Sequence, residues 1–579
     1  MRMSMRFGKT LRESPAEAEL PSHILMLRGG YISKVAAGIY NYMPFAWRAA
    51  RKIEEIMRRE MDAIGGQELL MPVVHPAELW QETGRWQAIG PEMVRMKDRS
   101  GRDMVLAMTH EETITDLARR YIDSYKQLPA VVYHIQTKFR DEPRSRAGLI
   151  RVREFIMKDA YSFHADQEGL DEYYPNMCRA YKRICHACGV PVVQVLGDVG
   201  MMGGTNAHEF TYITDYGEDT LLLCPECGYA ANRETATIKK DVAASGLSPE
   251  DIPAPEKVAT PGKDSIAAVS EFLGMDPKET MKSMVYLNGD SLVMVVIRGD
   301  LDVNEKKLAN LLRVGEVRLA YPEDLEKAGL NQGYMSPVGL KGIKVVCDDS
   351  LSADRGYVAG ANEAGFHLKN VVPGRDFAVD YRGDVVAARQ GDPCPVCGKP
   401  LDVKRGVEIG NTFKLGTRYS ASMGANYLDE NGKAKPLVMG CYGMGLGRLL
   451  ACVVEANHDE RGIIWPMTVA PYHIYLVALG ASDTVKNESE ALYRRLTSKG
   501  FEVVLDDRDE SAGVKFNDAD LLGMPIRLTL SERSLKAGGV ELKMRSEKSS
   551  RVVALSELEG ELSKIIDSEM RRFSPDEVI

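Results

Sequence analysis

Residues 139–163 read FRDEPRSRAGLIRVREFIMKDAYSF. The residues that lead into this stretch, VVYHIQTKFR at 131–140, alternate between two sets of side chains. This period of two predicts a β-strand with one apolar face and one polar-to-cationic face. A loop with Pro143 and Gly148 follows, and a second strand-like run carries Phe155. The stretch therefore predicts a hairpin of two strands joined by a long loop.

The predicted hairpin is strongly basic. Seven lysine or arginine residues lie between Lys138 and Lys158, against three acidic ones, on a chain with net charge −9. Arginine suits phosphate because its planar guanidinium donates hydrogen bonds in pairs and keeps its charge. The hairpin is therefore predicted to meet an anion. The alternative is a basic edge strand exposed to solvent.

Several motifs in this chain occur in the order of a known family. Phe139-Arg140-Asp141-Glu142, with Phe155 on the next strand, resembles the second signature motif of class II aminoacyl-tRNA synthetases. In detail the chain resembles the bacterial prolyl-tRNA synthetases that carry an inserted editing domain, over nearly its whole length. The other matching strings are Thr109-His110-Glu111-Glu112, Arg153-Glu154-Phe155, Met157–Phe163, Gly203-Gly204 with His208-Glu209-Phe210, and Gly440-Cys441-Tyr442-Gly443.

Length and composition set the frame for this resemblance. The 579 residues are too many for one hydrophobic core, so three or four domains are expected. No apolar run is long enough for a membrane span, and the first residues lack the apolar stretch of a secretory signal. Cysteines in Cys-x-x-Cys pairs suit metal better than disulfides, which indicates a cytoplasmic protein. The mild acidity requires that RNA bind at local basic patches.

The first family motif is predicted near the N-terminus. Residues 45–64 show the spacing of an amphipathic helix, and Gly65-Gly66 ends it. The segment Glu68–Pro72 is predicted as a short strand. Taken alone, the pattern indicates only a helix packed on a sheet. The resemblance implies that these elements form the interface of a homodimer.

Thr109-His110-Glu111-Glu112 has two interpretations. Thr109 is placed to cap the helix that follows, with Glu112 completing a capping box. The functional interpretation is that Glu111 binds the substrate's ammonium group while Thr109 assists, because a buried carboxylate needs a cationic partner.

The resemblance implies roles for further residues. Arg140, Glu142 and Arg448 are the expected catalytic residues, and Glu408 is expected to help hold Mg²⁺. The amino-acid site is expected to contain Thr109, Glu111, His208 and Cys441. The ATP site is expected to contain Arg140, Glu142, Arg151, Phe155, Arg448 and Glu408.

Two CPxCG sequences predict a metal site. They supply Cys224 and Cys227, then Cys394 and Cys397, which together are four thiolates for a structural zinc ion. The long segment between them is predicted to be an inserted domain, whose two ends must come close together. A closed four-cysteine site has no open coordination position, so catalysis is not expected there. The alternative is two turns without metal.

Residues 241–262 contain four prolines and are predicted to be a linker. Residues 263–390 then alternate helical and strand patterns and resemble the family's editing insertion, which hydrolyses tRNA mischarged with alanine. Lys282 and His367 match functional positions of that insertion. A second hydrolytic site is physically reasonable, because an apolar pocket gains only about 1–3 kcal/mol against a smaller amino acid.

The glycine-rich segment Gly443-x-Gly445-x-x-Arg448 resembles the third class II motif. Such a turn also occurs in dinucleotide-binding folds. Against that alternative, Arg448 occupies the position of the third glycine, and no suitable βαβ unit precedes the turn. From about residue 467 the pattern changes to a compact α/β domain that resembles the anticodon-binding domain of the family.

We therefore predict an α+β multidomain protein with a class II antiparallel sheet flanked by helices, an inserted α/β editing domain and a C-terminal α/β anticodon-binding domain. The expected boundaries are 1–223 and 406–466 for the catalytic domain, 224–405 for the insertion with editing at about 263–390, and 467–579 for the anticodon-binding domain. The resemblance implies ATP-dependent attachment of proline to tRNA(Pro) by a homodimer with no membrane association. The alternatives are a sister synthetase with another amino-acid specificity, a non-catalytic tRNA-binding paralogue and a zinc-dependent nucleic-acid-binding protein.

Overall fold

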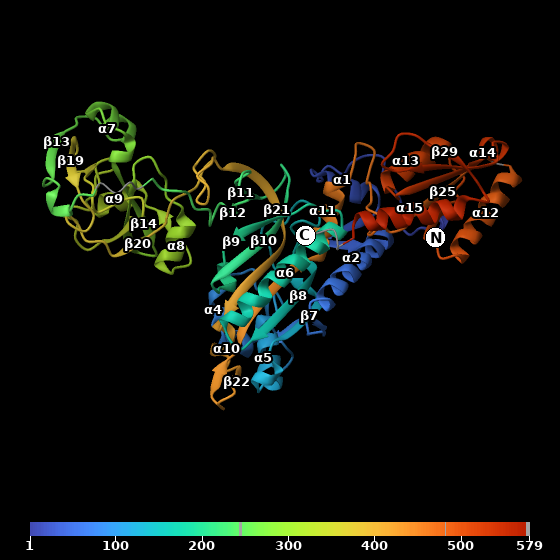
Figure 1. The fold of residues 1–579 in the computed structure, drawn as a ribbon, viewed down its shortest axis with the longest axis horizontal. Coiled ribbons are helices and arrows are strands. Elements are labelled where there is room, and N and C mark those ends of the chain that lie inside the picture. The colour runs from blue at the N-terminus through green and yellow to red at the C-terminus, as the bar shows by residue number, and fades with distance from the viewer. Residues whose placement is uncertain (242–245, 481, 575–579) are drawn as a thin grey trace. The chain divides into compact units, whose positions relative to one another are not determined.

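The computed structural model describes residues 1–241, 246–480 and 482–574. The chain divides into two units. Figure 1 labels their helices and strands. The first contains Met1–Gln194, Val199–Glu218 and Gly406–Ile579, and the second contains Val195–Asp198 and Asp219–Arg405. In the described ranges no helix is both long enough and apolar enough to cross a membrane.

The first unit is built on a sheet with the strand order β10–β21–β24–β8–β7–β3. All neighbours are antiparallel except β7 and β3. The predicted α+β fold with an antiparallel sheet flanked by helices is confirmed. The strands are β3 (Gln67–Glu68), β7 (Ala130–Phe139), β8 (Glu154–His164), β10 (Asn206–Ile213), β21 (Asp402–Gly416) and β24 (Val438–Gly445).

Helices cover both faces of this sheet. One face packs on α2 (Pro44–Asp62), α6 (Gln167–Ala187) and α11 (Leu446–Ala456), whose apolar side chains share a core with Tyr133, Ala160 and Tyr442 of the sheet. The other face packs on α5 (Glu111–Tyr121) and α10 (Arg418–Ser422), around Tyr161, Phe163 and Cys441. The alternation of side chains along β8 and β24 separates these two cores.

Helix α2 has the amphipathic face that the sequence predicts. Ile53, Ile56, Met57 and Met61 are all buried. The helix begins at a proline, and Gly65 beyond its end has φ +85°, a conformation that glycine adopts without strain.

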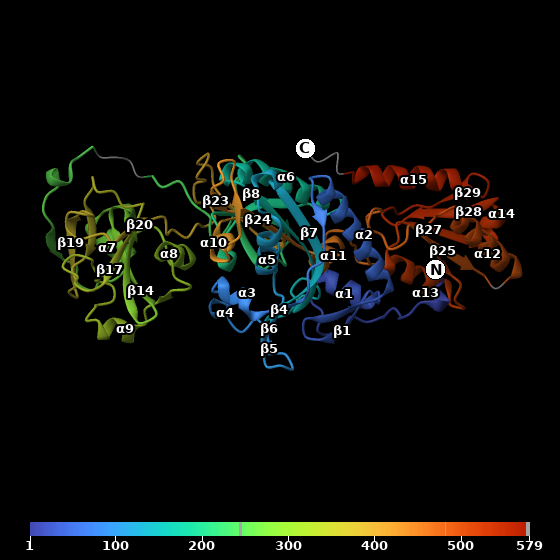
Figure 2. The ribbon, with the colours of Figure 1, turned by 90° about the horizontal axis from the view of Figure 1, so that it is seen from below.

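The C-terminal part of this unit has its own five-stranded sheet, with the order β26–β25–β27–β28–β29. Helices α12 and α15 pack on one face of it, and α13 lies on the other (Figure 2). The elements are β25 (Ile474–Leu479), α12 (Asp483–Ser498), β26 (Val503–Asp506), α13 (Ala512–Leu522), β27 (Ile526–Ser531), α14 (Glu532–Lys536), β28 (Gly539–Met544), β29 (Arg551–Ala554) and α15 (Leu558–Arg572).

Smaller elements complete the unit. Strands β1 and β2 form a hairpin, β4, β6 and β5 form a three-stranded sheet, and β22 pairs with β23. These elements are α1 (Pro21–Arg28), β1 (Ile32–Ala36), β2 (Ile39–Tyr42), β4 (Val74–Pro76), α3 (Ala77–Glu82), α4 (Arg85–Ala88), β5 (Arg95–Lys97), β6 (Asp103–Leu106), β22 (Asn426–Leu428) and β23 (Ala434–Pro436). Strand β9 (Val193–Gly197) contains residues of both units.

The second unit contains a five-stranded mixed sheet, β16–β14–β15–β17–β20, and a three-stranded antiparallel sheet, β13–β19–β18. Its elements are β11 (Asp219–Leu223), β12 (Ala230–Asn232), β13 (Glu256–Ala259), α7 (Ile266–Leu273), β14 (Met281–Asn288), β15 (Ser291–Arg298), α8 (Glu305–Leu312), β16 (Arg318–Leu319), α9 (Pro322–Lys327), β17 (Lys344–Asp348), β18 (Tyr357–Gly360), β19 (Phe366–Val371) and β20 (Tyr381–Gly383).

Three expectations about local structure are wrong. The strand predicted at Glu68–Pro72 is limited to β3, whose Gln67 and Glu68 pair with β7, and the last backbone hydrogen bond to β7 comes from Leu69. The alternative of a basic edge strand exposed to solvent is also wrong, since His134 and Lys138 of β7 are fully buried. The predicted linker 241–262 contains β13, which pairs with β19, while its residues 242–245 lie outside the described residues.

Candidate active site

Arg140 lies directly after the last residue pair of the β7–β8 hairpin. Its backbone N–H donates to the carbonyl of Arg153, and its Nε donates to the carbonyl of Met108 at 3.1 Å. The guanidinium lies 5.3 Å from the centre of the Phe155 ring. These contacts orient the side chain and leave both Nη atoms without a partner among the described residues, which suits a ligand with paired oxygen atoms.

Charged groups from two strands and two helices affect the pKa of Arg140. Burial lowers the pKa of its guanidinium, and Asp159 opposes that shift. Arg448 lowers the pKa further, whereas Glu408 and Glu111 raise it. These groups come from β8, α11, β21 and α5, so the fold brings residues far apart in the sequence to one site. An arginine stays charged even when it is desolvated.

Glu111 is fully buried at the start of α5. Its Oε2 accepts a hydrogen bond from the Thr109 hydroxyl, and its Oε1 accepts one from the Cys441 thiol at 2.9 Å. The predicted capping box is wrong: the N-cap residue is His110, which makes no side-chain cap, and the Thr109 hydroxyl is directed to Glu111 instead. Three of the four predicted amino-acid-site residues therefore lie in contact.

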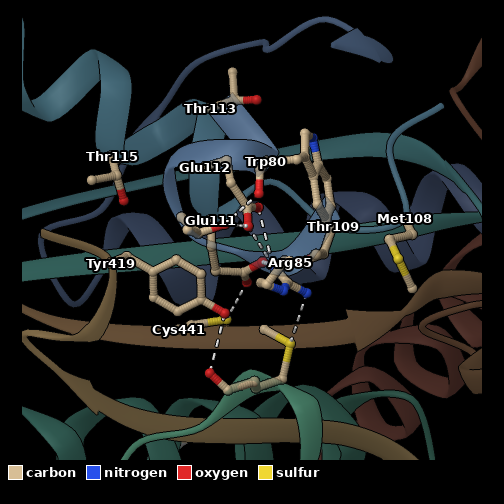
Figure 3. A network of polar contacts seen from close by, with 12 residues as sticks. Trp80, Arg85, Met108, Thr109, Glu111, Glu112, Thr113, Thr115, Tyr419 and Cys441 are labelled. Carbon is tan, nitrogen blue, oxygen red and sulfur yellow. Dashed lines mark hydrogen bonds and ion pairs between the residues drawn. The ribbon is translucent and has the colours of Figure 1, made fainter. Parts of the chain in front are cut away.

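Arg85 is a site residue that the sequence did not reveal. Its Nη1 donates to both carboxylate oxygens of Glu112, at 2.9 and 3.0 Å, and lies 3.5 Å from Oε2 of Glu111 (Figure 3). All three side chains are buried. Arg85 begins the four-residue helix α4 after Gly84, and such a short element has no periodic pattern to mark it.

The fourth predicted residue of the amino-acid site, His208, lies on β10. Its Nδ1 is 2.9 Å from the hydroxyl of Tyr174, and burial lowers the pKa of the imidazole. The preceding Gly203 has φ +72°, and a Cβ there would lie 1.6 Å from Nη1 of Arg418. The glycine therefore allows Arg418 to pack against the loop that leads to His208.

Glu142 follows Arg140 in the hairpin loop. Its Oε1 accepts a hydrogen bond from Arg151 at 2.9 Å and one from the backbone N–H of Arg144. The other Nη atom of Arg151 donates to Glu218 at 2.8 Å. The two predicted ATP-site residues Glu142 and Arg151 are therefore paired, and Glu218, which the sequence analysis missed, fixes the arginine from the other side.

Arg448 lies in the first turn of α11, which begins at Leu446. Its Nε donates to the carbonyl of Ile150 at 2.8 Å, and its Nη1 donates to the carbonyl of Glu408 at 2.7 Å. The Glu408 carboxylate lies 3.8 Å from the same Nη1. Arg448 thus ties the hairpin loop to β21. It is Arg140, however, that covers the Phe155 ring in this structure.

A buried ionic group lies on the sheet beside these residues. Lys138 Nζ is 3.0 Å from Oδ2 of Asp159 and 3.1 Å from Nε2 of His134. Burial raises the pKa of the Asp159 carboxyl, but Lys138 and His134 outweigh it and hold that pKa well below its usual value. Burial, followed by Lys138, lowers the pKa of the neighbouring His110 to about 2. His110, His134 and Asp159 have ligand atoms within 4.8 Å, yet the Lys138 ammonium already supplies their cation.

Lys282 and His367 line one small cavity in the second unit. Its volume is about 100 Å³, and its other walls include Ile266, Met281 and Val358. Lys282 Nζ donates to the carbonyl of Leu301 and to Asp302, while His367 Nδ1 lies 2.7 Å from the hydroxyl of Thr260. The structure thus brings both predicted editing residues to the same small, partly apolar space.

The four cysteines of the two CPxCG sequences, Cys224, Cys227, Cys394 and Cys397, lie close together in space. The sulfur atoms of Cys224 and Cys397 are 3.4 Å apart, those of Cys227 and Cys394 are 3.6 Å apart, and all four lie within 4.8 Å of one another. A zinc ion with Zn–S bonds of about 2.3 Å separates tetrahedral sulfurs by about 3.8 Å. The donor set and its spacing therefore fit a zinc ion.

Comparison with known proteins agrees with this geometry. Residues 94–457 match the family described as tRNA synthetase class II core domain (G, H, P, S and T), and residues 473–565 match an anticodon binding domain. The antiparallel sheet, the arginine of its hairpin loop and these matches define a class II aminoacyl-tRNA synthetase.

Relatives that are similar over nearly the full length identify the family within this class. A proline–tRNA ligase of Dehalococcoides mccartyi is 51% identical over 98% of this chain and 100% of its own length. One from Salinispora tropica is 48% identical over 98% of this chain and 96% of its own. The chain belongs to the proline–tRNA ligase family, as the sequence analysis predicted.

A solved structure has the same fold at low identity. The prolyl-tRNA synthetase of Cryptosporidium parvum, complexed with halofuginone and AMPPNP, has a TM-score of 0.59 at 13% identity and covers 98% of this chain and 80% of its own. This likeness supports the assignment of the fold.

Proposed function

We propose that this protein attaches proline to tRNA(Pro) in two steps, with ATP as co-substrate and a prolyl-adenylate as intermediate. The observation that carries the proposal is the buried Glu111 carboxylate near an arginine whose Nη atoms have no partner in the described part of the chain, in a member of the proline–tRNA ligase family. The relatives carry the name proline–tRNA ligase at about half identity over nearly full length.

In the first step the proline carboxylate attacks the α-phosphorus of ATP, and pyrophosphate leaves. The carboxylate is already ionised, so no general base is needed, and catalysis consists of positioning and charge stabilisation. Arg140 would hold the α-phosphate and the substrate carboxylate. Glu111, with Thr109, would hold the ammonium, while His208 and Cys441 complete the amino-acid site.

The remaining residues would hold ATP. Glu142 would accept a hydrogen bond from the adenine amino group, with Phe155 and Arg448 against the base and Arg151 holding Glu142. Glu408 is a partly exposed carboxylate with no cation closer than 3.8 Å among the described residues, which suits Mg²⁺. The Mg²⁺ ion supplies neutralisation of the phosphate charge when it is bound.

In the second step the terminal ribose hydroxyl of tRNA attacks the acyl carbon of the adenylate, and AMP leaves. The C-terminal part, with its match to an anticodon-binding domain, would bind the anticodon. The catalytic domain would comprise residues 1–223 and 406–466. The insertion with the editing domain would comprise 224–405, and the anticodon-binding domain 467–579. The protein would act as a homodimer in the cytoplasm.

The test is ATP–pyrophosphate exchange with purified protein. Exchange is expected with proline and ATP together, with alanine and threonine as controls for a sister specificity. Exchange that is absent with all three amino acids would favour a non-catalytic paralogue. Exchange that prefers threonine would overturn the proline assignment.

We further propose that the cavity at Lys282 and His367 hydrolyses alanyl-tRNA(Pro). Lys282 and His367 come from different elements and border the same space, whose volume of about 100 Å³ suits a small side chain. An amine and an imidazole supply the hydrogen-bonding and proton-transfer groups that ester hydrolysis uses.

Lys282→Ala and His367→Ala should each slow deacylation of alanyl-tRNA(Pro) by about tenfold or more, because each removes one of these groups. Proline-dependent exchange should stay unchanged. The matched control is Lys327→Ala, an exposed lysine at the end of α9. Deacylation at the wild-type rate in both cavity variants would contradict the assignment.

We propose that Cys224, Cys227, Cys394 and Cys397 hold one structural zinc ion. Purified protein should contain about one equivalent of zinc by elemental analysis, since four thiolates close the tetrahedral site. Cys224→Ser and Cys394→Ser should each lose the metal and lower the melting temperature, whereas Cys178→Ala, on α6, should keep it. Protein without zinc that unfolds at the same temperature would contradict this proposal.

A further inference from the structure

Two carboxylates and one guanidinium form a buried cluster beside the amino-acid site. Arg85 is 2% exposed, and Glu111 and Glu112 are fully buried. Arg85 donates to both oxygens of Glu112 and lies farther from Glu111, so its charge is used mainly by Glu112 (Figure 3). The Thr83 hydroxyl also donates to Glu112 at 3.0 Å, which leaves that carboxylate well satisfied.

Two aromatic rings pack against Arg85. Its guanidinium lies 4.9 Å from the centre of the Trp80 ring and 5.6 Å from that of Tyr419. Trp80 donates to His75 and Tyr419 donates to the carbonyl of Met202, so both rings are fixed in turn. A planar cation in contact with two fixed rings has little freedom to move toward another partner.

The cluster carries one uncompensated negative charge. Two carboxylates and one guanidinium sum to −1, and a buried charge without a partner is costly. Among the described residues, no cation outside the cluster makes an ion pair with Glu111: burial lowers the pKa of His110, Lys138 is engaged by Asp159, and Arg140 acts on Glu111 only at longer range. The cluster therefore lacks one cation in direct contact with its second carboxylate.

The two carboxylates differ in what they offer such a cation. Glu111 Oε2 already accepts from Thr109, whereas the one donor to Oε1 in the described part of the chain is the thiol of Cys441. A thiol is a weak donor that an ammonium group replaces with a net gain. The atom of the cluster that is best able to accept a hydrogen bond from a new cation is therefore Oε1 of Glu111.

We propose that Arg85 is a positioning residue that sets the charge of the amino-acid site: it neutralises Glu112 and leaves one negative charge on Glu111 for the ammonium group of the substrate. This inference rests on the proposed role of Glu111 as the ammonium-binding residue. It assigns specificity for a cationic amine to a residue that does not itself touch the substrate.

The test compares wild type with Arg85→Met, Glu112→Gln and the double variant in ATP–pyrophosphate exchange at varied proline and ATP. Glu112→Gln changes the charge of the cluster to 0, because Arg85 then neutralises Glu111 instead. Arg85→Met changes it to −2, and Glu112, left without its cation, then competes with Glu111 for the ammonium group. Each single change should raise KM for proline by about 30-fold. The double variant restores −1 on Glu111 and should recover about tenfold of that loss. KM for ATP should stay within about twofold of wild type in all variants.

The decisive readout is this recovery, because a purely structural role of Arg85 predicts that the two losses accumulate. Equal or greater loss in the double variant overturns the inference, as does an unchanged KM for proline in Arg85→Met. If Arg85→Met does not fold, the double variant must still bind proline more tightly than Glu112→Gln. Wild-type protein without proline-dependent exchange would instead overturn the proposed function.

Discussion

An Arg140→Ala variant loses proline-dependent ATP–pyrophosphate exchange by about 10³-fold or more while it stays folded. Within the described ranges the side chain makes one hydrogen bond, from Nε to the carbonyl of Met108, so its removal leaves few groups unsatisfied. The loss falls on the reaction, because a preorganised donor at a developing charge is worth about 10²–10³ in rate and this guanidinium is assigned two anionic partners. Exchange of labelled pyrophosphate into ATP measures the effect.

Two variants make this prediction specific. Arg140→Lys keeps the charge but lacks the planar pair of donors, and we expect it to recover only part of the activity. Arg179→Ala removes an exposed arginine from the outer side of α6 and should react like wild type. Near wild-type exchange by Arg140→Ala, with an unchanged melting temperature, would remove Arg140 from the mechanism.

The strands around Arg140 follow from local sequence patterns. Alternation over residues 131–140 predicted β7, and the paired strand β8 begins at Glu154, one residue before Phe155. Helix α2 was predicted from its apolar face, and the C-terminal strands from short apolar runs. These elements were found because period and composition act within a few residues.

Local sequence patterns could not predict which groups surround each face of these strands. A basic edge strand exposed to solvent was the alternative for β7, yet Lys138 is buried against Asp159 of β8 and beside His134. A buried lysine needs polar partners, which here come from another strand, and single-sequence patterns do not show such partners. The same reason explains why Arg85 and Glu218 were missed.

Competition between two hydrogen bonds explains the wrong capping box. The sequence pattern of Thr109 and Glu112 fits a cap, but the Thr109 hydroxyl donates to Glu111 and Glu112 pairs with Arg85. A buried carboxylate gains more from these donors than a helix end gains from a cap, which is worth about 1 kcal/mol. Departure from a local rule at a functional site is the expected pattern.

Glu111→Gln is expected to raise KM for proline by about 10²-fold, with KM for ATP nearly unchanged. The amide keeps the shape of the side chain, and its one carbonyl oxygen can still accept from either Thr109 or Cys441, but it removes the one negative charge that remains after Arg85 and Glu112 pair. The substrate's ammonium group would then be desolvated against a neutral group, which is the costly half of a broken buried ion pair.

Exchange assays at varied proline and at varied ATP separate the two effects, because loss of ground-state binding appears in KM for proline alone. Glu78→Gln, an exposed residue on α3, is the matched control for the same chemical change. A KM for proline within about twofold of wild type in Glu111→Gln would show that this carboxylate does not bind the amine. The charge argument for Arg85 would then fail with it, since both assign the only uncompensated charge of the cluster to the same carboxylate.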